Sequence, residues 1–334
     1  MVDNEIVSII MPVYNVDGYI AKAIESIIAQ TISEWELLII DDCSTDDSIK
    51  IATEYSLKDK RIKIISHKIN KGVSEARNTG IRSAIGKYIC FVDPDDYCGD
   101  TYLEDLLRIK KDNYQLMIGG YVRECNNIVE RKLLSLDIAT FTADNAILNM
   151  IGMKFFDWSP CDKLFLREVL LINKLQFNPD YKLAEDLDFC WRYIRNVNKI
   201  GFVPSYQYHY VVHEESVTHI KKTIVRLTSV NVMRKLYTES FQMNGLIRKR
   251  MRELYVKEMA SCIKDILSEK KYANDIKEMQ KIIRRNLIVI KTNSDFGLHI
   301  KMAILFFCLP YFVIEEICRW IDFVDVYNKL KKVN

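Results

Sequence analysis

The sequence lacks several patterns that mark particular classes of protein. Its nine cysteines include no CxxC pair, and several stand inside apolar runs, so we expect reduced, buried thiols in a cytosolic protein and no structural zinc site. No apolar run reaches the roughly 18 residues that an ordinary transmembrane helix needs. Residues 1–5 are polar and acidic, from which we expect no secretory signal peptide.

Two nucleotide-binding motifs and a strong net charge are also absent. No GxGxxG follows the first apolar run and no GxxxxGK[ST] occurs, so neither dinucleotide nor P-loop binding is supported. The formal net charge of +3 indicates no general attraction to nucleic acid. The 334 residues are 49% hydrophobic and 28% charged, which suits a sizeable core in one large domain or two smaller ones.

Apolar runs and helical patterns alternate over the first hundred residues. Strands of five to seven residues between longer helices indicate βαβ units and a mostly parallel sheet with flanking helices, an α/β fold. We expect strands at residues 5–11, 35–40, 61–66 and 87–92, and helices at residues 17–30, 46–55 and 73–84.

Polar clusters stand directly after three of these strands. Ligands of parallel sheets bind at the carboxyl ends of the strands. We therefore expect one crevice to be shared by residues 12–15, 41–44 and 93–96.

The rest of the chain has weaker patterns. Strands are expected at residues 116–123 and 200–203, and helices at residues 143–153 and 186–195. From about residue 220 the sequence is rich in Lys, Arg, Glu, Leu and Ile, with almost no Gly or Pro, which indicates helices. We expect an α/β domain at residues 1–219 and a mainly helical region at residues 220–334.

Four aspartates lie within eight positions: Asp93, Asp95, Asp96 and Asp100. Carboxylates this close raise one another's pKa unless a positive group lies among them. The D-x-D pair at 93 and 95 would face one Mg²⁺ or Mn²⁺ that also holds a diphosphate. Three other interpretations stay open: a helix N-cap cluster, an EF-hand loop with Cys98 where the turn needs Gly, and a haloacid-dehalogenase-type phosphatase with Tyr97 at the usual Thr or Val position.

Other residues near the expected crevice suit a nucleotide. The Asp41-Asp42 pair would accept from a base N–H or a ribose hydroxyl, Arg77 would reach a base or a phosphate, and Tyr14 would stack on a ring. Each alone also fits an ordinary solvated side chain.

The segment YKLAEDLDFCWRYI, residues 181–194, opens a helix with Glu185 and Asp186. Acidic residues in a first turn are favoured by the helix dipole alone. The alternative is a general base that removes a proton from an incoming hydroxyl.

Several of these segments together resemble the family 2 glycosyltransferases. They are VSIIMPVYN (7–15), LLIIDDCSTDDS (37–48), NKGVSEARNTGI (70–81), GKYICFVDPDDY (86–97) and AEDLDF (184–189). The resemblance covers residues 5–110 and continues more loosely through WSPCDKLFLREVL and YQYHYVVHEESVT to about residue 218. It implies the GT-A fold and inversion of the anomeric centre.

The resemblance also implies roles for individual residues. Pro12, Tyr14 and Asp42 would line the uracil of a UDP-sugar, with Asn70 and Arg77 beside base and phosphate. Asp93 would lie near the ribose and the metal, and Asp95 would be the direct ligand of Mn²⁺ or Mg²⁺. Asp186 would be the catalytic base, and Glu185 or Asp96 would bind the donor or acceptor sugar.

Three positions depart from the family pattern. Cys43 stands where Gly is usual after the two aspartates, and Pro94 replaces the commoner Ser or Ala of the D-x-D motif. Val211 stands where relatives often have an Arg that touches diphosphate. His213 would substitute for it, at phosphate or as a further metal ligand, or would be an ordinary surface histidine.

The implied activity is metal-dependent transfer of a sugar from a UDP-sugar to a saccharide hydroxyl in surface polysaccharide synthesis, such as that of capsule or O-antigen. The acceptors of bacterial relatives are commonly lipid-linked. Two alternatives stay open: a non-catalytic sugar-nucleotide binder that assists another transferase, and a sugar-phosphate phosphatase. The oligomeric state is open, a homodimer included.

The apolar stretch 302–314 contains Pro310 and is too short to span a membrane. It suits an amphipathic anchor on a membrane surface, which would place the protein at the inner face of the cell membrane, or a packed or partner-facing helix. The basic residues that would face anionic headgroups are Lys221, Lys222, Arg248, Lys249, Arg250, Arg284 and Arg285.

Overall fold

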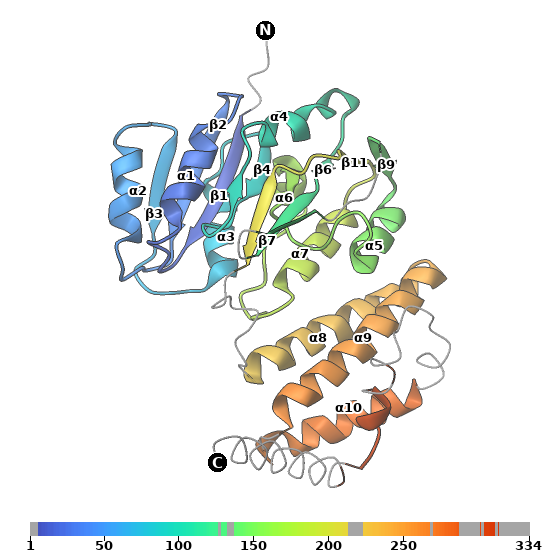
Figure 1. Cartoon of the computed structure of the whole chain (residues 1–334). Coiled ribbons are helices and arrows are strands. Elements are labelled where there is room, and N and C mark those ends of the chain that lie inside the picture. Colours follow the sequence, from blue (N-terminus) through green and yellow to red (C-terminus); the bar gives the residue numbers. More distant parts are fainter. Residues whose placement is uncertain are drawn as a thin grey trace. The chain divides into compact units, whose positions relative to one another are not determined.

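The computed structural model describes residues 6–125, 128–131, 137–212, 223–267, 270–286, 301, 304–310 and 313. The chain divides into two compact units, Met1–Ile220 and Lys221–Asn334, and each is described by itself. Figure 1 shows a sheet with flanking helices in the first unit and packed helices in the second.

The first half of the N-terminal unit is a parallel α/β layer. Its strands are ordered β3-β2-β1-β4, and all three pairings are parallel. Every residue of β1, β2 and β4 is buried, because helices cover the sheet. The elements are β1 (Val7–Val13), α1 (Ile20–Ile28), β2 (Trp35–Asp41), α2 (Ser48–Ser56), β3 (Ile62–Ser66), α3 (Val73–Ser83) and β4 (Tyr88–Phe91). The predicted α/β alternation is confirmed, to within a few residues at each boundary.

Helix α3 lies unusually close to the sheet. A Cβ atom placed on Gly80 would come within 2.3 Å of the Ile10 side chain in β1. Glycine therefore sets the distance between α3 and the sheet, and α3 carries Arg77.

The large sheet continues beyond β4 with four further strands. They are ordered β4-β10-β6-β11-β9. β10 (Lys163–Leu166) is antiparallel to both β4 and β6 (Leu116–Ile118), and β11 (Ile200–Phe202) is parallel to β6. The edge strand β9 (Ala139–Phe141) is antiparallel to β11. The mostly parallel sheet is as expected, whereas β9 and β10 are additions that no sequence pattern indicated.

A second, four-stranded sheet is ordered β5-β12-β7-β8. Its strands are β5 (Tyr97–Cys98), β12 (Tyr208–Val212), β7 (Tyr121–Cys125) and β8 (Ile128–Arg131). The single strand expected at 116–123 is wrong, because Gly119 and Gly120 divide it between the two sheets. Their N–H groups donate to Asp162 O and Ser205 O at 2.8 and 2.7 Å, so the chain leaves one sheet and enters the other.

Helix α7 (Glu185–Ile194) is anchored by a buried aromatic cluster. The Phe189 ring stacks on Phe177 at 3.9 Å between centroids and meets Phe91 and Phe165 edge-on. Such contacts add to the burial of apolar area and fix the helix on β4 and β10. The other helices of this unit are α4 (Tyr102–Leu107), α5 (Ala143–Gly152) and α6 (Arg167–Ile172).

The described part of the C-terminal unit is helical, as expected. It contains α8 (Thr223–Glu239), α9 (Gly245–Ile266) and α10 (Ala273–Arg285), and α9 contacts both neighbours. Apolar residues of the three helices form its core, among them Leu236, Val256, Ile263 and Ile283. Within the described ranges, no helix combines the length and apolar character needed to cross a membrane. Residues 302, 303, 311, 312 and 314 of the stretch 302–314, with Lys221 and Lys222, lie outside those ranges.

Candidate active site

The three polar clusters lie at the carboxyl edge of the parallel strands, after β1, β2 and β4. The chain order reverses beside β1, which has β2 on one side and β4 on the other, and ligands of open α/β sheets bind at such points. The ends of β1 and β2 are joined there, because Asp42 N donates to Val13 O at 2.8 Å. Pro12 is buried within β1, and Tyr14 is 49% exposed just beyond it.

Arg77 is the positive group among the carboxylates. Its buried guanidinium donates from Nη2 to Asp93 Oδ1 at 3.0 Å and from Nη1 to Asp186 Oδ1 at 2.7 Å. Glu185 Oε1 lies 3.9 Å from the same Nη1. The structure thus brings Arg77, Asp93, Glu185 and Asp186 together, whereas the sequence had placed Arg77 beside a base and a phosphate.

Asp186 stands in the first turn of α7 with its side chain 26% exposed. The pKa of this carboxyl is raised to about 7, mainly by burial, with Arg77 opposing the rise and Glu185 and Asp93 adding to it. A carboxylate with a pKa near neutrality is suited to accept a proton. Ala184, the residue before this turn, has a left-handed backbone with φ of 65°, which is strained for alanine.

Asp96 connects the D-x-D segment to β12. Its Oδ2 accepts from the Tyr208 hydroxyl at 2.6 Å and its Oδ1 from Val211 N at 2.8 Å. Burial raises the pKa of this carboxyl well above its usual value, as do the charges of Asp93 and Asp95. Asp96 therefore holds the D-x-D segment to β12, and Val211 contributes its backbone where the family resemblance leads us to expect an arginine side chain.

Asp42 organises the loop after β3. Its carboxylate accepts from Gly72 N at 2.6 Å and Lys71 N at 2.8 Å, and it lies 2.7 Å from His67 Nδ1. Asn70 is exposed on the loop so held. A carboxylate has about four acceptor sites, and the contacts with these three partners, among them a second one from Lys71 N to Oδ2 at 3.1 Å, occupy them in a buried position.

The donor set beside Asp93 suits a hard divalent cation. Asp93 is 31% exposed, and Asp95, two positions on, is partly exposed. No group of three or more potential metal ligands occurs among the residues that can be described, so a protein-only cage does not fit. Proteins usually hold Mg²⁺ with one or two carboxylates, and substrate phosphate oxygens complete the coordination of the ion. His213 lies outside the described residues.

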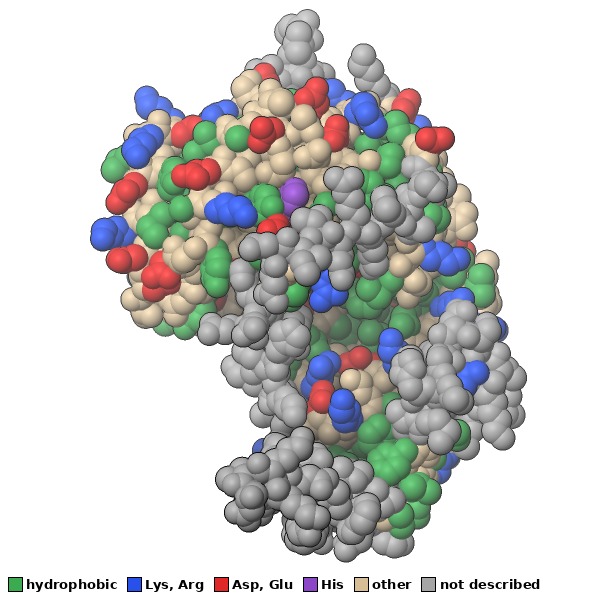
Figure 2. Space-filling view, in the orientation of Figure 1, with side chains coloured by type: hydrophobic (Ala, Val, Ile, Leu, Met, Phe, Trp, Pro, Cys, Tyr) green, Lys and Arg blue, Asp and Glu red, His purple; other side chains and the backbone are tan. Residues whose placement is uncertain are grey.

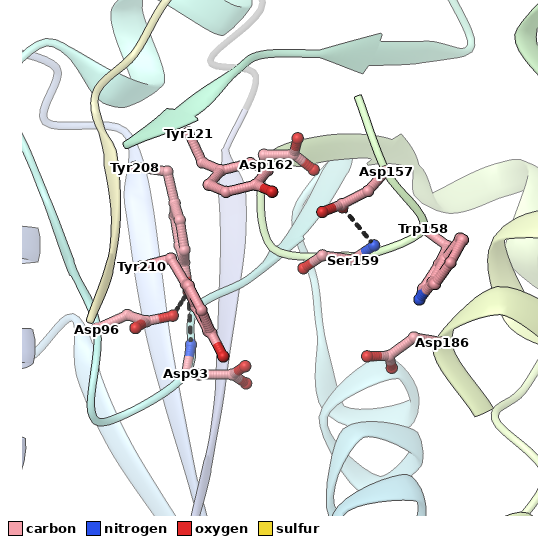
Figure 3. Close-up of a pocket in the computed structure, with 10 residues that line it drawn as sticks. All are labelled: Asp93, Asp96, Tyr121, Asp157, Trp158, Ser159, Asp162, Asp186, Tyr208 and Tyr210. Carbon is pink, nitrogen blue, oxygen red and sulfur yellow. Dashed lines mark hydrogen bonds between the residues drawn. The ribbon is translucent and has the colours of Figure 1, made fainter. Parts of the chain in front are cut away.

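A cavity of about 330 Å³ separates Asp93 from Asp186. Figure 3 shows the two carboxylates pointing toward each other from opposite sides, with Trp158 next to Asp186. The segment 157–162 forms one wall, where Asp157 Oδ1 accepts from Ser159 N at 2.9 Å. The aromatic residues of the cavity are Tyr121, Trp158, Tyr208 and Tyr210.

Sequence reasoning singled out none of these wall residues as site residues. The resemblance of WSPCDKLFLREVL to the family was the available signal, because it contains Trp158, Ser159 and Asp162. Asp162 pairs with the fully buried Lys163, and burial raises the pKa of this carboxyl to about 6 while Lys163 lowers it. Asp157 and Tyr121 fell outside every quoted motif.

The eight described cysteines are free, as expected, and five are buried: Cys90, Cys98, Cys161, Cys190 and Cys262. Cys43 is partly exposed and has φ of 69°. This is the left-handed region that favours glycine, which accounts for the glycine usual at this place in the family.

The strand order and the acidic cavity beside it define an α/β protein with a candidate ligand site at the carboxyl edge of its sheet. A model of glycosyl transferase family 2 matches residues 8–171. An uncharacterized glycosyltransferase of Haemophilus influenzae is 31% identical over 223 residues, which cover 64% of this chain and 68% of that protein. The chain belongs to glycosyltransferase family 2.

Two further relatives match 64% and 45% of the chain. The uncharacterized glycosyltransferase EpsJ of Bacillus subtilis is 32% identical over 219 residues, covering 64% of this chain and 63% of EpsJ. The Escherichia coli protein WfgD is 36% identical over 152 residues, covering 45% of this chain and 58% of WfgD. WfgD is named UDP-Glc:alpha-D-GlcNAc-diphosphoundecaprenol beta-1,3-glucosyltransferase. The chain thus spans a little under two thirds of the length of relatives such as EpsJ.

The fold is shared with a solved structure. Residues 1–349 of Staphylococcus aureus TarS, crystallised with UDP, superpose with a TM-score of 0.69 at 22% identity. The match covers 94% of this chain and 91% of the TarS fragment. The expected GT-A fold and the helical C-terminal region are confirmed.

Proposed function

We propose that this chain transfers a sugar from a UDP-sugar to a hydroxyl of a saccharide acceptor, with inversion of the anomeric centre. One observation carries the proposal: Asp93 and Asp186 face each other across a cavity and share Arg77. A non-catalytic sugar-nucleotide binder has no need of a carboxyl whose pKa is poised near 7.

Asp186 is the general base of this proposal. Its partly exposed carboxylate takes the proton of an acceptor hydroxyl, which attacks the anomeric carbon from the side opposite the nucleotide. A single displacement turns an α-linked donor into a β-linked product. Arg77 holds Asp186 in place and favours its ionised form.

Mn²⁺ or Mg²⁺ is the proposed cofactor, held by Asp95 and Asp93 together with the donor's diphosphate. When bound, such an ion supplies Lewis-acid stabilisation of the departing UDP. His213 is proposed as a further phosphate or metal contact. The partial exposure of Asp93 toward the cavity supports this placement.

The nucleotide is proposed to lie over the ends of β1 and β2. Tyr14 is exposed there for stacking, and the buried Asp42 holds the loop that carries Asn70. Pro12 and Asn70 would complete the wall around the base. The UDP in the crystals of TarS, which has the same fold, supports a UDP-linked donor.

The acceptor is proposed to be a lipid-linked saccharide, as the name of WfgD states for that protein. The C-terminal unit would then work at the cytoplasmic face of a membrane. In it, Phe241 and Leu246 are exposed near Arg248 and Lys249 at the start of α9, a combination that suits an anionic surface. Arg250 and Arg284 suit it less, because the first pairs with Glu253 and the second donates to Cys308 O.

A panel of UDP-sugars tests the proposal, with UDP release measured in Mn²⁺ and again after addition of EDTA. We expect release from one donor that EDTA abolishes, because hydrolysis by water replaces the missing acceptor. UDP should also raise the melting temperature. Release of inorganic phosphate without UDP, or neither release nor a UDP-induced thermal shift, would contradict the proposal. A thermal shift without release under any acceptor condition would favour the non-catalytic binder.

A further inference from the structure

The cavity between Asp93 and Asp186 is acidic. Its lining includes neither Lys nor Arg among the residues described, and half of it is aromatic or serine. Five aspartates line it: Asp93, Asp96, Asp157, Asp162 and Asp186. Figure 2 draws the surface of the same chain, where acidic and basic side chains are interspersed, unlike this cavity.

Three of the five carboxyls pair with a basic side chain, and a fourth, Asp96, is buried. Arg77 pairs with Asp93 and Asp186, and Lys163 pairs with Asp162. Asp96 is buried, with the Tyr208 hydroxyl and Val211 N as its hydrogen-bond partners.

Asp157 is the exception. Its partners are Ser159 N, at 2.9 Å, and the hydroxyl of Tyr121, and both are uncharged. No ion pair of the described residues includes Asp157. It therefore presents a carboxylate without a directly paired basic side chain to whatever occupies the cavity, and Lys163 acts on it only at longer range.

We propose that the transferred ring is an uncharged sugar, a neutral hexose or an N-acetylhexosamine, and that Asp157 makes the site reject uronic acids. This inference rests on the proposed function, because it assigns the cavity to the sugar of the donor. Sugar hydroxyls donate to carboxylates, and the apolar faces of a ring pack on aromatic side chains such as Trp158 and Tyr210. A carboxylate on the ring would instead meet Asp157 at short range in a partly dry site, where like charges repel strongly. The cation expected at Asp95 does not remove this repulsion, because the donor's own diphosphate offsets its charge.

The test compares UDP-sugars that differ only at C6: UDP-glucose with UDP-glucuronate, and UDP-galactose with UDP-galacturonate. Two quantities are measured for each, the kcat/KM for UDP release and the affinity in competition with UDP. For the pair that contains the better neutral donor, we expect kcat/KM and affinity both to be at least tenfold higher for the neutral sugar than for the uronate. A tenfold difference corresponds to about 1.4 kcal/mol. Asp157→Asn should reduce this ratio at least threefold. Asp180→Asn removes the same charge at an exposed position outside the cavity lining and should leave the ratio unchanged.

Equal or better use of the uronates by the unmodified protein would overturn the inference without reference to any variant. An unchanged ratio in folded Asp157→Asn would overturn the role of Asp157. These failures are distinct from failure of the proposed function, in which UDP itself would not bind. If UDP binds, and if the neutral UDP-sugar and the uronate of each pair also bind with equal affinity, this inference alone is refuted.

Discussion

Asp186 Oδ1 accepts a 2.7 Å hydrogen bond from Nη1 of Arg77, which is 109 positions away in the sequence. The other Nη of the same guanidinium reaches Asp93 at 3.0 Å. The acidic cluster therefore has a positive partner within the chain itself, in addition to any cation that it binds. The residue proposed as base and the residue proposed to lie beside the metal are held by one side chain.

Removing the positive charge of Arg77 should destabilise the fold. Arg77→Gln leaves Asp93 and Asp186 close together without their partner, and breaking a buried pair in this way costs about 3–5 kcal/mol. The free energy of unfolding from urea denaturation measures the loss. Arg82→Gln, on the exposed end of the same helix, is the control and should cost less than about 1 kcal/mol. Equal costs for the two variants would contradict the central place of Arg77.

The pH dependence of activity follows from the state of Asp186. Its base form is the ionised one, and its pKa is raised to about 7, so kcat/KM should rise with pH through about 7 and then level off. Arg77 lowers this pKa, so its loss should move the rise to higher pH. Arg77→Lys keeps the charge and should move it less than Arg77→Gln. A rise that stays at the same pH in both folded variants would exclude this electrostatic role.

The link between Asp96 and Tyr208 is expected to be structural and largely uncharged. Tyr208→Phe removes a 2.6 Å hydrogen bond to a buried carboxyl and should cost about 1–3 kcal/mol of stability. Asp96→Asn keeps an acceptor for Tyr208, and its cost should be smaller because burial and the charges of Asp93 and Asp95 raise the pKa of the carboxyl and so disfavour its charged form. Thermal unfolding of the two variants decides the order. A larger loss in Asp96→Asn would mean that Asp96 is ionised in the folded protein.

Cys43 offers a test of backbone strain. Its φ of 69° costs about 1–2 kcal/mol for a residue with a side chain. Its thiol contributes only a weak 3.8 Å contact to Lys68 O. Cys43→Gly should therefore stabilise the protein by up to about 1 kcal/mol, less than the full strain because glycine makes the unfolded chain more flexible. Cys43→Val should lower stability, and a glycine variant less stable than the valine variant would refute the argument.

The parallel layer was predictable because its strands are buried on both faces. Strands such as β1 and β2 then appear as unbroken apolar runs between helical patterns. Strands β5, β9 and β10 have two to four residues, too few for any periodicity to show, and an antiparallel insertion leaves no mark in a short apolar run. The division of the expected strand at Gly119 and Gly120 could not be predicted, because it depends on tertiary hydrogen bonds that carry the chain from one sheet to the other.

The candidate site was predictable where it follows strands and fits a family motif. The motifs singled out Asp93 and Asp186, and the structure places both in the lining of one cavity. The environment of Arg77 was not predictable, because one of its two hydrogen-bond partners, Asp186, stands on a helix 109 positions away. Asp157 was missed because nothing in its neighbours along the chain marks it, and only folding places it opposite Asp93.

The most direct test of the account is Asp186→Asn, measured for turnover and for UDP affinity in the same preparation. The substitution keeps the size of the side chain and a hydrogen-bond acceptor for Arg77 but removes the base. We predict a fall in kcat of about 10³-fold with the Kd for UDP changed less than about threefold, while Asp180→Asn matches the unmodified protein in both. Retained turnover in Asp186→Asn would contradict the central claim that this carboxylate is the base of a sugar-transfer reaction.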